Sequence, residues 1–210
     1  GDVTIGTYSS VRTGVLSVGT GSRVNSRFIV SSSGGTVSLV VDEFGNVYNR
    51  GGGNISTNTA FGASALSINV GGYNNTAIGV NALLSNTSGS FNTAIGNNTL
   101  YSNTTGGTNT AIGISTLYSN TTGTSNTAIG NNTLYNNTTS SYNTAIGDGS
   151  LYSNTSGNDN TAIGDGSLQG NTTGNYNTAI GHLSLYSNQT GSYNIGIGSQ
   201  AGVYRVSFLG

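Results

Sequence analysis

The chain has 210 residues and a formal net charge of −1, and only 5% of its residues are charged, against about 25% in an average globular protein. All five arginines lie outside residues 58–193 and lysine is absent, which excludes a basic stripe for nucleic acid along that part. No apolar run approaches the ~18 residues of a transmembrane helix, and the lack of cysteine excludes disulfide bridges. Isoleucine, valine, threonine and tyrosine recur at fixed places, which predicts an ordered, all-β fold.

Residues 1–57 show no repeat and are predicted to form a β-rich cap or connector. Strands are predicted where β-branched residues cluster between Gly and Ser: Val3–Ile5, Val11–Val18, Val24–Val30, Thr36–Val41 and Asn46–Tyr48. The residues Asp42-Glu43-Phe44-Gly45 are typical of a hairpin turn between the last two of these strands. Gly51-Gly52-Gly53 is expected to join this region to the next.

Residues 58–193 consist of eight consecutive 17-residue repeats that open with Asn-Thr-Ala-Ile/Phe-Gly. The repeats begin at Asn58, Asn75, Asn92, Asn109, Asn126, Asn143, Asn160 and Asn177. A degenerate copy opens at Asn194, and residues 194–210 are predicted to end the array as a cap or connector. A fixed short period predicts a solenoid, because each unit buries its apolar face only when its neighbours stack on it.

One repeat is described here by positions 1 to 17, counted from its leading Asn. Positions 2–4 (Thr-Ala-Ile) are predicted to form a strand with Thr and Ile on one face and Ala on the other. Gly at position 5 predicts a turn, and positions 7–11 are predicted to form a second strand with the leucine of position 9 inward. Positions 12–15, Asn-x-Thr/Ser-Gly, predict a second turn, in which the stacked asparagines form a side-chain ladder.

Each turn offers only about three reliable apolar side chains, so a lone coil would have a thin interior to offset an ordering entropy of ~1–2 kcal/mol per residue. We therefore expect a parallel β-roll or β-helix that is homotrimeric, with the alanine faces buried against sister subunits. The residues expected in the core and in the trimer contacts are Ala77, Ile78, Ala94, Ile95, Leu100, Ala111, Ile112 and Leu117.

The string Asn-Thr-Ala-Ile-Gly at 92–96, followed by Leu-Tyr-Ser-Asn-Thr-Thr-Gly at 100–106, resembles repeats of bacteriophage tail-fibre proteins. It is also similar to the shorter repeats of trimeric autotransporter adhesin heads. The segment 38–47, Ser-Leu-Val-Val-Asp-Glu-Phe-Gly-Asn-Val, looks like the one that often precedes such regions in tail fibres. The resemblance covers residues ~38–200 and implies a parallel trimeric β-roll displayed outside a cell or on a virion. The period of 17 departs from the adhesin head repeat.

Tyrosines form a column at position 10 that Gln169 interrupts, and they are the candidate residues for stacking on sugar rings. The column consists of Tyr101, Tyr118, Tyr135, Tyr152 and Tyr186. The alternative is that these rings cover the leucine layer or pack between chains, as aromatic side chains on β surfaces commonly do.

Asp148, Asp165 and His182 occupy position 6 of three successive repeats, where in-register stacking would bring them ~5 Å apart. Carboxylate and imidazole ligands so close could share a cation. The alternative is a solvated surface column, because position 6 is Asn or hydrophobic in the other full repeats.

No nucleophile signature accompanies the many serines, and His182 is the only histidine, so we expect no enzymatic activity and no cofactor. The predicted function is a structural and adhesive fibre module, the trimeric shaft of a phage or virion tail fibre that supports attachment to the host surface. The first alternative is a bacterial extracellular adhesin or a self-assembling surface filament. The second is a carbohydrate-binding module that uses the tyrosine column. The expected partners are sister chains, cell-surface polysaccharide and other fibre modules.

Overall fold

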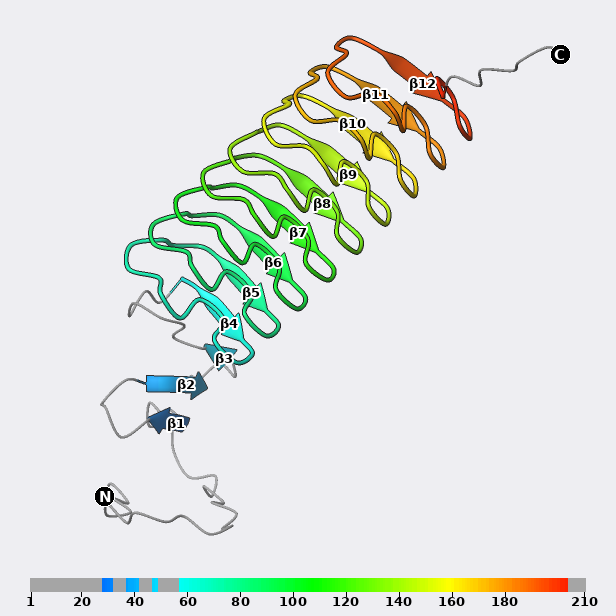
Figure 1. Ribbon diagram of the computed structural model, residues 1–210. Coiled ribbons are helices and arrows are strands. Elements are labelled where there is room, and N and C mark those ends of the chain that lie inside the picture. The colour runs from blue at the N-terminus through cyan, green and yellow to red at the C-terminus, as the bar shows by residue number, and fades with distance from the viewer. Residues whose placement is uncertain (1–27, 32–36, 42–46, 49–56, 204–210) are drawn as a thin grey trace, which may run out of the picture.

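The computed structural model describes residues 28–31, 37–41, 47–48 and 57–203, with side chains placed for 57–203 only. Figure 1 shows a stack of similar coils, each of which contributes one strand to a single long sheet. The nine strands are β4 (Thr59–Phe61), β5 (Thr76–Ile78), β6 (Thr93–Ile95), β7 (Thr110–Ile112), β8 (Thr127–Ile129), β9 (Thr144–Ile146), β10 (Thr161–Ile163), β11 (Thr178–Ile180) and β12 (Ile195–Ile197). The protein is therefore an all-β solenoid with about 17 residues per turn.

The turns of the solenoid stack in register, because every strand pairs in parallel with the same three positions of the next turn. Ala94 lies opposite Ala111, which in turn lies opposite Ala128. The β-branched Thr and Ile around each alanine favour an extended backbone. The Gly at position 5, with φ between 114° and 141°, ends each strand in a conformation that L side chains rarely adopt.

Three short strands precede the solenoid and pair antiparallel in the order β1-β2-β3. They are β1 (Phe28–Ser31), β2 (Val37–Val41) and β3 (Val47–Tyr48). All three fall where strands were predicted, with β1 at the end of the predicted strand Val24–Val30, and the last two pair as a hairpin would. The predicted strands Val3–Ile5 and Val11–Val18, the turn Asp42–Gly45, the junction Gly51–Gly53 and nearly all of the C-terminal segment Val203–Leu209 lie outside the described residues.

The predicted second strand at positions 7–11 is wrong, since each described turn contains one strand only. Positions 7 and 9 adopt positive φ instead, as in Ser115 (50°) and Leu117 (52°). Around these positions the backbone forms successive hydrogen bonds from one residue to the third residue before it, for example from the N–H of Ala65 to the carbonyl of Gly62 (3.2 Å) and from the N–H of Asn69 to that of Leu66 (3.3 Å). The chain therefore returns across the coil through consecutive tight turns and not through an extended segment.

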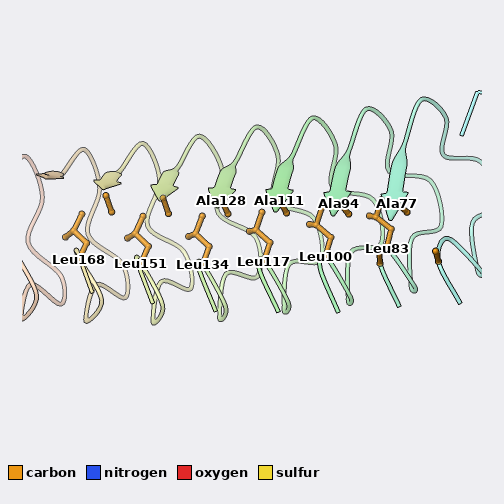
Figure 2. Packing of buried hydrophobic residues seen from close by; sticks show 14 of the residues in the cluster. Ala77, Leu83, Ala94, Leu100, Ala111, Leu117, Ala128, Leu134, Leu151 and Leu168 are labelled. Carbon is orange, nitrogen blue, oxygen red and sulfur yellow. The ribbon is translucent and has the colours of Figure 1, made fainter. Parts of the chain in front are cut away.

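The alanines face the interior of their own chain, so the expectation that they pack on sister subunits is also wrong. Ala77, Ala94 and Ala111 are fully buried in the single chain, as are Leu100 and Leu117. Figure 2 shows the leucines of position 9 pointing toward the alanines of the strands. Ile78, Ile95 and Ile112 belong to the opposite, outer face of the sheet. The coil is so thin that only a methyl group fits under each strand once leucine fills the space from the other side.

Two ladders of buried asparagine fill the rest of the interior. At position 12, Nδ2 of Asn120 donates to Oδ1 of Asn103 (2.7 Å) and to the carbonyl of Gly123 (3.1 Å), and the predicted ladder is thereby confirmed. At position 1, Nδ2 of Asn109 donates to Oδ1 of Asn92 (3.1 Å) and to the same Gly123 carbonyl (2.9 Å). No buried side-chain nitrogen or oxygen of the described residues lacks a partner. The two ladders thus satisfy the polar interior without help from a second chain.

Candidate functional site

The tyrosines at position 10 form a column of stacked rings along the segment that lies across the core from the sheet. The ring centroids of Tyr101 and Tyr118 are 5.0 Å apart, those of Tyr118 and Tyr135 are 5.0 Å apart, and those of Tyr135 and Tyr152 are 5.3 Å apart. Their planes are within 10° of parallel. The one-turn repeat of the backbone therefore sets the ring spacing, and the rings cover one another inside the column.

The column is broken after Tyr152, where position 10 is Gln169, and it resumes at Tyr186. The break forms a notch of about 390 Å³ lined by Tyr152, Ser153, Gln169, Gly170, Tyr186, Ser187 and Gln189. Tyr186 is 40% exposed. Four of the five candidate tyrosines therefore stack on one another, and the last of these four, Tyr152, flanks an opening together with Tyr186.

Further aromatic side chains lie at the end of the repeat. Tyr176 and Tyr193, both at position 17, stack with their centroids 5.0 Å apart, and Tyr73 meets Phe91 edge to face at 5.2 Å. Tyr142 is 62% exposed at the same position. These rings are more scattered than the column at position 10 and line no described notch.

The three candidate metal ligands at position 6 lie on the surface in successive turns. His182 Nε2 is 4.0 Å from Asp165 Oδ2, and the two side chains are 55% and 68% exposed. Asp148 is exposed one turn before them. Among residues 57–203 no group of three His, Asp or Glu side chains is arranged to hold a metal ion. The arrangement is that of a solvated surface column, in which an exposed pair is worth little.

The outer face of the sheet is a regular surface that runs along the solenoid. It carries the threonines of position 2 and the isoleucines of position 4, one of each per turn from β5 to β11. Ile78 is 39% exposed and Ile180 is 38% exposed, while Ile95, Ile112 and Ile129 are partly buried among their neighbours. The face contains no charged side chain, so an apolar stripe with a threonine border runs along the sheet.

No protein-family model, no curated protein and no solved structure matches this chain. The described part of the chain also contains no helix that is long and apolar enough to cross a bilayer.

Proposed function

We propose that this protein is a structural fibre module, the trimeric shaft of a phage or virion tail fibre that holds an adhesive tip away from the particle. The in-register stack of turns carries the proposal, because it produces a straight rod whose length grows by one strand spacing per repeat. At ~4.8 Å per turn, the eight full repeats extend for roughly 38 Å. The residue types support a structural role as well. Between residues 57 and 203, the acidic, basic and histidine side chains amount to three aspartates and His182.

The outer face of the sheet is the surface proposed to join the chains. Three copies that place their threonine–isoleucine faces around a common axis would bury an apolar stripe along the full length of the rod. Exposed apolar surface of this continuity marks interaction sites, and a cyclic arrangement of identical chains repeats one contact at every turn. The proposed interface therefore uses the isoleucines, while the alanines are buried in the core of each chain.

Replacing Ile112 with aspartate is expected to dissociate the proposed trimer while each chain keeps its fold. The substitution puts a charge in the centre of the stripe, where burial without a partner is unfavourable, and Ile112 does not contribute to the alanine–leucine core. Sedimentation equilibrium should change from three times the 21.1 kDa chain mass to the chain mass itself, with an unchanged circular dichroism spectrum.

The matched control is Ile114→Asn. Ile114 is 57% exposed at position 6, where the turns on both sides carry Asn97 and Asn131, so this variant removes an equal apolar side chain without touching the stripe. It should remain trimeric. A folded monomer for the unaltered chain would refute the trimeric shaft, and straight rods in electron micrographs would support it.

The alternative of a bacterial adhesin or self-assembling surface filament uses the same rod, displayed outside a cell. The two roles differ in whether the ends of one rod bind to the ends of another. Filaments that lengthen with protein concentration would favour self-assembly, whereas rods of one fixed length would favour a shaft between other fibre modules.

A further inference from the structure

The break in the tyrosine column lies across the core from the outer face of the sheet. Two changes from the usual repeat occur together there, Gln169 in place of tyrosine at position 10 and Gly170 in place of serine or asparagine at position 11. A Cβ on Gly170 would lie 2.7 Å from the carbonyl oxygen of Tyr186, so the neighbouring backbone excludes any larger residue. The loss of the tyrosine ring at position 10 is therefore accompanied by a change in the adjacent backbone, which has no space for a side chain at position 11.

The size of the notch follows from the stacking distance of the column. Consecutive rings are 5.0–5.3 Å apart, so Tyr152 and Tyr186, two turns apart, have room between them for one additional ring. Gln169 is narrower than a tyrosine and fills only part of this room; its Nε2 lies toward Gly149 of the preceding turn, 2.9 Å from where a Cβ on that glycine would be. The volume of about 390 Å³ is at the small end of the range for ligand sites.

The chemistry of the lining defines the class of ligand. Two tyrosines provide aromatic walls, two serines provide hydroxyl groups, and Gln169 and Gln189 provide amides that can both donate and accept. The side-chain amides of Gln169 and Gln189 form no hydrogen bond to any residue that the structure describes. No charged residue lines the notch, so nothing in it favours a phosphate, a carboxylate or an ammonium group.

We propose that the notch binds one neutral pyranose ring of a saccharide, held between Tyr152 and Tyr186 with its hydroxyl groups on Gln169, Gln189, Ser153 and Ser187. The C–H faces of such a ring fit aromatic walls, and its hydroxyl groups fit unpartnered amides. A purely aromatic ligand would contact the walls without using the amides. The site belongs to a single chain and lies across the core from the outer face of the sheet, so it does not depend on the trimer proposed above.

The test is titration of the full chain with a panel of neutral methyl pyranosides (gluco, manno, galacto and N-acetylglucosamine forms), followed by saturation-transfer NMR and calorimetry. At least one of them should bind in the millimolar range. Gln169→Tyr should reduce that affinity by at least about tenfold, because the new ring completes the column and fills the notch. Tyr186→Ala should reduce it as well, by removing one wall.

Tyr193→Ala is the matched control, because this ring is 76% exposed at position 17 and lies outside the notch. It should bind the same sugar with unchanged affinity. Circular dichroism of each variant shows that a loss of binding is not a loss of fold. Absence of binding by every neutral pyranoside, or equal binding by the Gln169→Tyr variant, would overturn the proposal. Either outcome would leave the sedimentation result, and hence the shaft, unaffected.

Discussion

Replacing Gly113 with alanine is expected to destabilise the solenoid by about 3–6 kcal/mol, among the largest effects of any single methyl group in this chain. Gly113 has a φ of 135°, where an L side chain is strained. Its Cβ would also collide with the carbonyl oxygen of Gly130 in the next turn and lie 3.0 Å from Oγ1 of Thr116. The in-register stack brings the position 5 glycines so close that none has room for a side chain while another turn follows it.

Gly198 provides the control for this prediction within the same chain. It occupies position 5 of the last turn with a φ of 114°, but a Cβ there would meet nothing within 4 Å. Gly198→Ala should therefore cost only the backbone strain, about 1–3 kcal/mol. Chemical denaturation of both variants measures the difference. Equal shifts in the two midpoints would mean that the turns do not approach one another as the structure has them.

Replacing Asn109 with aspartate is the second substitution with a large expected effect, about 3–5 kcal/mol of lost stability. Asn109 is fully buried, and its Nδ2 donates to Oδ1 of Asn92 and to the carbonyl of Gly123. A carboxylate of the same shape would turn both donated bonds into contacts between acceptors and would bury a charge without a counter-ion. Thermal and denaturant unfolding at neutral pH measure the loss.

The loss from Asn109→Asp should become smaller as the pH falls. Burial among carbonyl oxygens disfavours the charged form, so the folded state raises the pKa of the new carboxyl above its unfolded value, and protonation restores a donor. Asn97→Asp is the matched control, since Asn97 is exposed at position 6, where Asp148 and Asp165 already stand. Its stability should change by less than about 0.5 kcal/mol. A similar loss at both sites would contradict the buried ladder.

The length of the turn, the strand at positions 2–4 and the Asn ladder at position 12 could be predicted from the sequence because each depends on local chemistry. Gly at position 5 needs a positive φ, and an identical Asn in every turn stacks on itself. The second ladder, at position 1, could not be predicted in the same way, although Asn58 to Asn194 repeat as regularly as the asparagines of position 12. An asparagine directly before Thr-Ala-Ile fits the start of a strand equally well, so its repetition does not by itself indicate a buried amide.

The direction of the two faces of the strand could not be predicted, because it depends on the thickness of the coil. A β-branched face ordinarily indicates the core, and a leucine ordinarily indicates an extended or helical backbone. Here Leu117 and its equivalents adopt a left-handed conformation, for which leucine gives no sequence signal. That conformation shortens the return path across the coil, so the leucines reach the strands and only alanine fits beneath them. The outward isoleucines follow from this geometry.

The candidate site was only partly predictable for a similar reason. The interruption of the tyrosine column at Gln169 is visible in the sequence, but its importance depends on the stacked rings on either side and on the backbone at Gly170. The position 6 column shows the opposite case. Asp165 and His182 do come close, as the period predicts, but they lie exposed on the surface and do not converge on a common point.

The central claim is that every 17 residues add one turn in register. Its most direct test is to measure distances between spin labels along one column of the solenoid. One label is placed at Asn97 and the other, in turn, at Asp148, Asp165 or His182. All four residues occupy the exposed position 6, and the paired sites are three, four or five turns apart. With labelled chains diluted in unlabelled protein, the mean distance should rise by about 4.8 Å for each added turn. A distance that stays constant, rises irregularly or shows no defined maximum would contradict the stack.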